Sequence, residues 1–154
     1  MQHKILVTYF SASGVTARAA KEIASSVGAD IQEIVPAAPY SAADLNWMDK
    51  SSRTTKESKD ETCRPPMAAD IDIKPYDTIF IGFPVWWYKE PAIIDTFLES
   101  ANFAGKRVIP FATSGGSGID GAEKRMKKLC PSADWVKGKL VNHGAGAWAK
   151  GAAE

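Results

Sequence analysis

Short apolar runs rich in β-forming residues alternate with loops and helix-like stretches, and this alternation limits the folds open to the chain. The runs are 4–10, 30–35, 77–83 and 107–113, with a last strand expected near 135–142. The first and third are typical of strands buried on both faces. Strands that alternate with helices pair in parallel, because right-handed crossovers place helices on both faces of the sheet. The sequence therefore predicts a five-stranded, three-layer α/β sandwich.

Helical patterns occupy the intervals between these strands. Small apolar residues recur at helical spacing up to Val27, and Gly28 supplies a C-terminal stop signal. Further helices are expected from about Glu90 and over 119–130. The polar stretch 42–60 is interpreted as a solvated helix or a long connection that covers one edge of the sheet.

Three positions bear on these assignments. Ser41 is a candidate cap for a helix in the polar stretch. Pro110 weakens the strand over 107–113, because a proline in a central strand removes a ladder donor. The end of the chain from Gly144 is expected to be a short helix or a frayed tail. No repeat or linker divides the sequence, so one domain is predicted over 1–154.

Composition excludes several classes of protein. The 154 residues carry 19 basic and 18 acidic side chains, without the basic excess typical of a nucleic-acid binder. No run of about 18 apolar residues would span a membrane, and no signal peptide precedes the first strand, which predicts a cytoplasmic protein. Two cysteines and two histidines, far apart in sequence, disfavour a disulfide framework and a zinc site. No metal site is predicted.

Open α/β sheets bind ligands beyond the carboxyl ends of their strands. The first loop at such an end is Ser11-Ala12-Ser13-Gly14-Val15-Thr16. Its three hydroxyl groups can donate hydrogen bonds, its glycine lets the backbone approach a ligand, and the following helix offers first-turn amides and partial positive charge. These features suit a monophosphate held by neutral donors. They also suit a tight turn that only caps the helix, and the loop by itself leaves both interpretations open.

The loop lacks the lysine of the nucleotide triphosphate-binding loop and the glycine pattern of a dinucleotide-binding turn. The segment Thr8-Tyr-Phe-Ser-Ala-Ser-Gly-Val-Thr16 instead resembles the FMN-phosphate loop of the flavodoxin family. The later segments Gly82-Phe-Pro-Val-Trp-Trp87 and Thr113-Ser-Gly-Gly-Ser-Gly118 resemble a flavodoxin-like subfamily with a Trp-Trp loop. The resemblance covers residues 4 to about 142.

This resemblance implies a parallel sheet of order 2-1-3-4-5 and noncovalently bound FMN. Matched to the family's loop, the phosphate would be held by the hydroxyls of Ser11, Ser13 and Thr16. The backbone amides of Ala12, Gly14, Val15 and Thr16 would complete that site.

The second loop implied by the resemblance flanks the flavin ring and comprises Pro84, Val85, Trp86, Trp87 and Tyr88. Side chains of adjacent residues at the end of a strand point to opposite sides, so Trp86 and Trp87 are not both expected to face the ring. One is expected to stack on it while the other packs on the sheet or lines the pocket mouth. The alternative is that both tryptophans are core aromatics.

The third loop comprises Thr113, Ser114, Gly115, Gly116, Ser117 and Gly118. Its glycines allow a close approach to the ring edge, where backbone amides would bond the pyrimidine side, as the resemblance implies. Such donors would stabilise the negative charge that builds up on reduction. The alternative is a flexible turn that caps the next helix.

Taken together, the three loops predict an FMN-binding electron-transfer protein whose partners are a reductase and an acceptor protein, with no catalytic residue required. The alternative is an NAD(P)H-dependent quinone or flavin reductase on the same fold, acting on a small quinone. The absence of glycine between Pro84 and Tyr88 favours this alternative, because family members that stabilise one-electron-reduced flavin have a glycine there. A third possibility is a cofactor-free interaction or regulatory domain of the same architecture. Its phosphoacceptor version is disfavoured, because Asp30 and Asp77 begin strands instead of ending them.

Overall fold

The computed structural model describes residues 4–11, 14–38, 40–41, 43–45, 48–49, 51–60, 62–86, 89–113, 118–141 and 145–153. Its elements are β1 (Ile5–Tyr9), α1 (Val15–Val27), β2 (Asp30–Glu33), α2 (Arg53–Lys59), β3 (Thr78–Pro84), α3 (Ala92–Ser100), β4 (Arg107–Thr113), α4 (Asp120–Leu129), β5 (Asp134–Trp135), β6 (Lys139–Leu140) and α5 (Ala145–Ala153).

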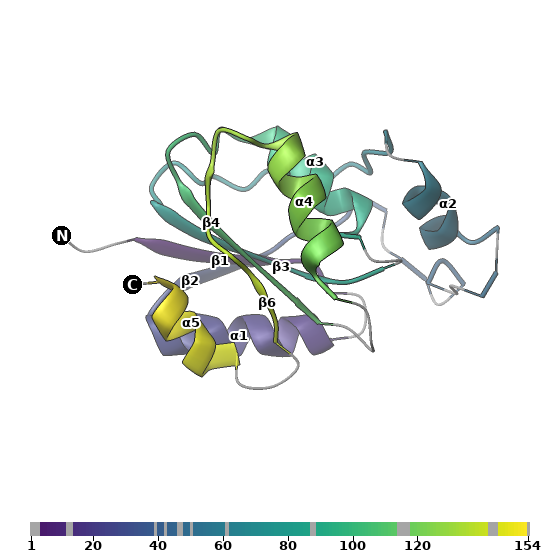
Figure 1. Ribbon diagram of the computed structural model, residues 1–154. Helices are drawn as coiled ribbons and strands as arrows, with labels where there is room; N and C mark the ends of the chain where they lie inside the picture. The colour runs from purple at the N-terminus through teal and green to yellow at the C-terminus, as the bar shows by residue number, and fades with distance from the viewer. Residues whose placement is uncertain are drawn as a thin grey trace.

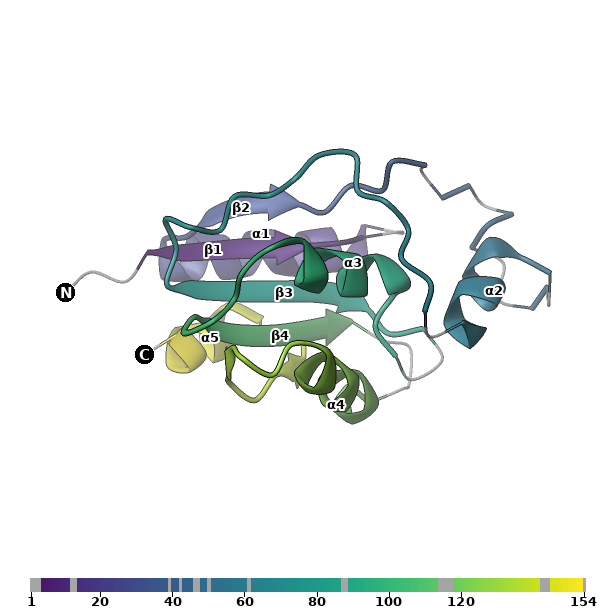
Figure 2. The same cartoon turned by 90° about the horizontal axis from the view of Figure 1, so that it is seen from above.

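The strands form one parallel sheet in the order β2-β1-β3-β4-β5, and β6 also pairs with β4. The order expected from the resemblance is confirmed. Seen from above, the carboxyl ends of the central strands all point to the same edge of the sheet (Figure 2). The loops after β1, β3 and β4 therefore meet at that edge.

The predicted last strand is divided in two, and Pro110 accounts for the division. β4 pairs with β5 through Arg107 and Val108, and with β6 through Phe111 and Ala112. Pro110 lies between these two pairings and has no N–H to donate to an edge strand. Gly138 passes beside it so closely that a Cβ there would lie 2.2 Å from the Pro110 carbonyl oxygen.

Helices cover both faces of the sheet (Figure 1). On one face α3 and α4 pack over a cluster that includes Leu6, Phe83 and Phe97. On the other, α1 and α5 pack over a cluster that includes Val7 and Phe80. Burial of these apolar side chains on two faces is the main source of stability in such a fold.

The ends of α1 follow the signals in the sequence. Gly14 precedes the helix with φ of 93°, and Gly28 ends it with φ of 64° while its N–H bonds the Ala24 carbonyl. Both conformations are left-handed, which favours glycine. The tail forms α5, which lies against α1: the Gly146 N–H donates to the Glu22 carboxylate. The helix interpretation of the tail is therefore the correct one.

The polar stretch departs from a helix over 42–60. Ser41 and Asp44 exchange hydrogen bonds, each backbone N–H donating to the other's side-chain oxygen, which closes a single turn. The helix α2 begins only after Ser52, whose side chain accepts from the Thr55 N–H. It stands beyond the carboxyl ends of the strands, not along a sheet edge (Figures 1 and 2).

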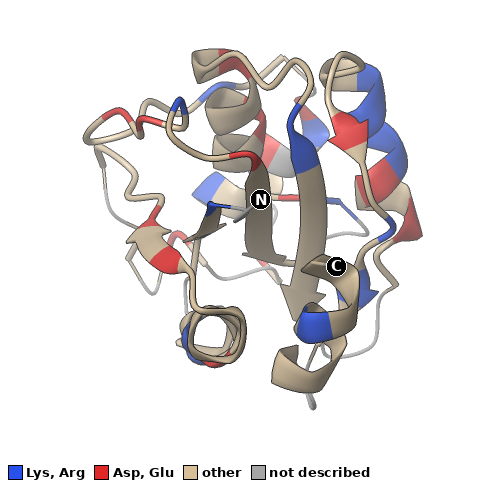
Figure 3. Ribbon diagram, turned by 90° about the vertical axis from the view of Figure 1, so that its left-hand side faces the viewer, with Lys and Arg blue, Asp and Glu red and all other residues tan. Residues whose placement is uncertain are grey.

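Acidic and basic positions are interspersed over the elements (Figure 3), in keeping with the balanced composition. Within the described ranges, no helix is long and apolar enough to cross a membrane. The same residues include no group of three or more His, Cys, Asp or Glu side chains placed to hold a metal ion.

Candidate functional site

Thr113, at the end of β4, joins the three loops at the carboxyl edge. Its hydroxyl oxygen lies 2.7 Å from that of Thr16 in the first loop, and both side chains are buried. Its carbonyl oxygen accepts a hydrogen bond from the Val85 N–H, at 3.0 Å, in the second loop. Thr113 of the third loop is thus bonded to the second loop and to the first loop, which lie about 30 and 100 positions earlier in the sequence.

The described part of the first loop leaves several donors without an acceptor inside the helix. The Gly14 carbonyl accepts the first helical hydrogen bond from the Arg18 N–H, so the amides of Val15 and Thr16 have no helical acceptor. The Ser11 hydroxyl oxygen accepts from the Gly14 N–H, at 3.1 Å, and retains its own proton. The Thr16–Thr113 pair has two hydroxyl protons and uses one between them.

These donors fit a phosphate monoester. They are neutral hydroxyl and amide groups at the N-terminus of a 13-residue helix, where the helix dipole favours an anion. The backbone at Gly14 has a positive φ, so a side chain at this position would be strained where the loop turns into the helix. Thr8 is not part of this set, because its hydroxyl donates to the Phe80 carbonyl within the sheet.

Backbone hydrogen bonds join two described residues of the segment after β3, Trp86 and Lys89. The backbones of Trp86 and Lys89 exchange two hydrogen bonds, each 3.0 Å long. The Trp86 ring contacts Phe10 and Tyr40 edge-on, with both centroid separations 5.7 Å. Trp86 therefore packs against Phe10 and Tyr40.

The segment around α2 supports this aromatic cluster. The Tyr40 hydroxyl donates to Glu57, and the Arg53 guanidinium carbon lies 3.9 Å from the centre of the Tyr40 ring. Arg53 also pairs with Glu57 at 2.9 Å and donates to the Ala38 carbonyl. Burial, followed by the hydrogen bond to Glu57, raises the pKa of Tyr40. The α2 segment thus anchors the ring that supports Trp86.

The structure brings together the described members of the predicted site at one edge of the sheet. These are Ser11, Gly14, Val15, Thr16, Pro84, Val85, Trp86, Thr113 and Gly118. Ala12, Ser13, Trp87, Tyr88, Ser114, Gly115, Gly116 and Ser117 lie outside the described residues. Contact of any of these residues with a flavin remains a prediction.

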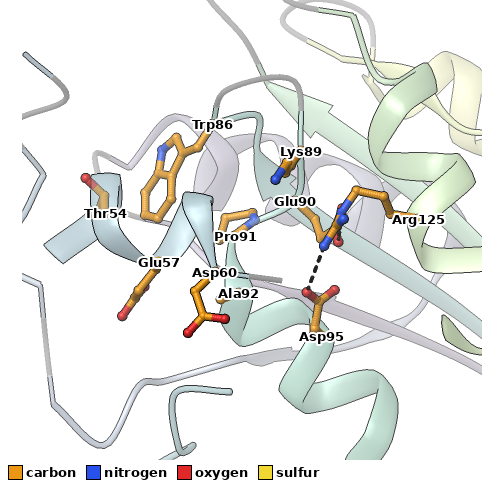
Figure 4. A pocket seen from close by; sticks show the side chains of 10 residues that line it. All are labelled: Thr54, Glu57, Asp60, Trp86, Lys89, Glu90, Pro91, Ala92, Asp95 and Arg125. Atoms are coloured by element: carbon orange, nitrogen blue, oxygen red, sulfur yellow. Dashed lines mark hydrogen bonds and ion pairs between the residues drawn. The ribbon is translucent and has the colours of Figure 1, made fainter. Parts of the chain in front are cut away.

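Sequence reasoning missed a buried charged cluster directly after the second loop (Figure 4). Glu90 follows Lys89, Asp95 lies in the first turn of α3, and Arg125 reaches both carboxylates from α4. Glu90 and Asp95 are 5% and 4% exposed, respectively. The signal in the sequence was an Asp between Ile94 and Phe97, on the apolar face of the expected helix.

Solved structures with the same fold include close relatives. A candidate flavoprotein from Bacteroides eggerthii is 44% identical, with 99% of each chain covered and a TM-score of 0.94. One from Bacteroides uniformis is 48% identical over 97% of this chain and 99% of that chain, with a TM-score of 0.92. A flavoprotein from Lactobacillus acidophilus in complex with FMN shares the fold at 21% identity, covering 99% and 100%, with a TM-score of 0.81.

A parallel α/β sheet of order 2-1-3-4-5 with phosphate-type donors at its carboxyl edge defines a flavodoxin-like protein. The family model described as Flavodoxin matches residues 4–150, and the chain belongs to this family. Among curated proteins none matches the chain significantly.

Proposed function

We propose that this protein binds FMN and carries electrons between redox partners. The observation that carries the proposal is the junction at Thr113, which holds a phosphate-type donor set and the Trp86 loop together at one edge of the sheet. Membership of the flavodoxin family and the FMN complex of the Lactobacillus acidophilus protein support FMN as the cofactor. Bound FMN supplies the redox chemistry, and the protein sets its affinity and potential.

The phosphate would be held by the first loop. Its ligands would be the hydroxyls of Ser11, Ser13 and Thr16, with the amides of Ala12, Gly14, Val15 and Thr16. The Gly14 amide, which donates to Ser11 without ligand, would turn to the phosphate. The buried Thr16–Thr113 pair supports this assignment, because one hydroxyl proton of the pair remains to be donated. A neutral donor set binds the dianion without a competing ion pair.

The ring would be held by the second and third loops. Phe10 and Tyr40 already contact Trp86, so Trp87 is the tryptophan assigned to stack on the flavin. Pro84, Val85 and Tyr88 complete this wall. Amides in the loop from Thr113 to Gly118 would bond the pyrimidine edge of the ring.

A reductase that uses NAD(P)H to reduce a quinone or a free flavin is the second candidate. The turn between Trp86 and Lys89 contains no glycine, and two backbone hydrogen bonds hold it. A peptide flip would give one residue left-handed backbone angles. These angles are strained for residues other than glycine, so the flip is unfavourable here. This feature favours two-electron chemistry.

For the carrier we expect a reductase and an acceptor protein as partners, and a cytoplasmic location.

The phosphate assignment is tested by comparing FMN with riboflavin, which lacks the phosphate. Replacing Ser13 by Ala together with Thr16→Ala is expected to weaken FMN binding by 10-fold or more, since each hydrogen bond to a charged group contributes about 1.5–3 kcal/mol. Riboflavin binding is expected to change far less. Equal losses for the two ligands would contradict the assignment.

Carrier and reductase are separated by turnover. The FMN-loaded protein, mixed with NADH or NADPH and a soluble quinone in the absence of any reductase, is expected to show no turnover above free FMN. Stepwise anaerobic titration with dithionite gives the number of reduction stages. Sustained NAD(P)H oxidation with reduction in a single stage would replace the carrier by the reductase.

A further inference from the structure

The charged cluster behind the second loop contains two carboxyl groups that are short of hydrogen-bond donors. The Glu90 and Asp95 side chains are 0% and 5% exposed. Arg125 contacts one oxygen of each, with its Nε 3.2 Å from Glu90 Oε1 and its terminal nitrogen 3.8 Å from Asp95 Oδ2. Glu90 Oε2 and Asp95 Oδ1 are buried and have no hydrogen-bond partner among the described residues.

Two ionised carboxylates in this arrangement would be costly. Each would keep one buried oxygen without a donor, because Arg125 and Arg64 reach only the other oxygen of a carboxylate, at 3.2 to 3.9 Å. The two side chains are within hydrogen-bonding reach of each other, so a proton on one carboxyl group makes it a donor to the other and removes one charge.

Charged groups of both signs surround the pair. Arg64, before α3, lies 3.9 Å from Asp95 Oδ2 but forms its shorter contact with Glu99 of α3, at 2.8 Å. Lys128 and Arg125 come from α4, while Glu57 of α2, Asp60 directly after it and Lys89 line a smaller pocket beside the pair (Figure 4). Acidic neighbours thus offset part of the positive charge around the pair.

The electrostatics agree with this reading of the geometry. Burial raises the pKa of Glu90, and the hydrogen bond and negative charge of Asp95 raise it further. Burial also raises the pKa of Asp95, against the lowering effects of the Glu90 hydrogen bond and the charges of Arg125 and Arg64.

A cavity connects this pair to solvent. It has a volume of about 490 Å³ and is lined by Arg64, Glu90, Asp95, Arg125, Lys128 and Leu129. Both residues line this space with their carboxyl groups buried behind its surface, and both also line the smaller pocket that contains Trp86 (Figure 4). The pair therefore stands between an opening to water and the loop that ends β3.

We propose that the carboxyl groups of Glu90 and Asp95 share one proton at neutral pH and form an acid–base pair that exchanges it with solvent through this cavity. When the proton leaves to an acceptor, two carboxylates remain against Arg125, and a proton from water restores the pair. A role of this proton toward a reduced cofactor rests on the proposed function, but the shared proton itself does not.

Infrared spectroscopy of the purified protein at pH 7 tests the proposal. We expect one protonated-carboxyl C=O stretching band that moves on exchange into D₂O. The band should disappear in Glu90→Gln and in Asp95→Asn, and remain in the matched control Glu99→Gln, which removes an exposed carboxylate from the same helix. No such band in the wild type, or a band that survives both variants, would overturn the proposal.

Carbon-13 NMR titration of the wild type, labelled at Asp and Glu carboxyl carbons, gives the same answer without substitutions. Two resonances should titrate together above the range of ordinary carboxyl groups, and independent titration of both within that range would overturn the shared proton. In the FMN-loaded protein, reduction should change the infrared band of the wild type. An unchanged band would remove the role toward the cofactor while leaving the shared proton in place, and failure to bind FMN would contradict only the proposed function.

Discussion

Thr16 and Thr113 place their hydroxyl oxygens 2.7 Å apart in the buried base of the site, although 97 positions separate them. The bond links the start of α1, which follows β1, to the end of β4, and β3 lies between β1 and β4 in the sheet. It fixes the distance between the loop assigned to the phosphate and the loop assigned to the ring edge. A preorganised pair of loops binds a ligand at a lower conformational cost than two independent ones.

A double-mutant cycle measures this link. Thr16→Val and Thr113→Val each keep the side-chain shape and leave the other hydroxyl unpaired, at an expected loss of about 1–3 kcal/mol in the free energy of unfolding of the protein without ligand. The double variant is expected to lose less than the sum, because no orphaned hydroxyl remains. Urea unfolding of the four proteins gives the coupling energy, and additive losses would show that the bond contributes nothing.

The two adjacent tryptophans are expected to respond oppositely to substitution. Trp86→Leu removes contacts with Phe10 and Tyr40, and should lower the free energy of unfolding by about 1–3 kcal/mol with a smaller effect on FMN affinity. Trp87→Leu should weaken FMN binding by several-fold, with little change in stability. Each variant serves as the control for the other, in paired measurements of unfolding and of flavin fluorescence quenching. The reverse pattern would exchange their roles.

Gly82 makes room in the core for the Phe111 ring. A Cβ at this position would lie 2.1 Å from the nearest ring carbon, so Gly82→Ala is expected to destabilise the protein by about 1–3 kcal/mol through overpacking. Gly151 in α5 is the matched control, because a Cβ there meets nothing within 4 Å. Gly151→Ala should raise stability by about 0.5–1 kcal/mol through helix propensity. Thermal unfolding of both variants checks this prediction. Equal shifts of the unfolding temperature in the two variants would contradict it.

The positions of the main strands could be predicted from the sequence because the signals for a strand are local. The apolar run 107–113 coincides with β4 as observed, and Gly28 ends α1 where expected. Pro110 was understood only as a weakness of its own strand. Its actual effect falls on the neighbouring edge, which breaks between β5 and β6. That consequence depends on which strand lies next to β4, and local sequence patterns do not specify the neighbour.

In the candidate site, too, local features could be predicted from the sequence and contacts between distant segments could not. The first loop and the Trp-Trp loop were found because their residue types are unusual where a strand ends. The Thr16–Thr113 bond and the Glu90–Asp95 pair could not be predicted from local sequence patterns. Each depends on how close the fold brings two side chains from different segments. The polar stretch left a helix and a long connection open, and it contains both, because Ser41 and Asp44 close a turn before the short helix α2.

The carboxyl pair also predicts how stability depends on pH. Burial and Asp95 raise the pKa of Glu90 above that of an unfolded chain, so the folded protein binds more protons than the unfolded one between the two values. The stabilisation is full below the ordinary pKa of a glutamate and is lost as pH rises through the raised value. The free energy of unfolding should therefore fall above about pH 5 by up to about 1.4 kcal/mol per pH unit.

Urea unfolding of the wild type, Glu90→Gln and Glu99→Gln from pH 5 to 9 checks this dependence. Gln at position 90 keeps the side-chain shape and cannot ionise, so the slope should flatten in that variant. Glu99→Gln, which changes a half-exposed partner of Arg64, should retain the wild-type slope. Because the folded pair gains a proton on acidification, the two variants should differ most in their free energy of unfolding at alkaline pH. A difference in the free energy of unfolding that grew toward acidic pH would mean that Glu90 is ionised in the folded protein.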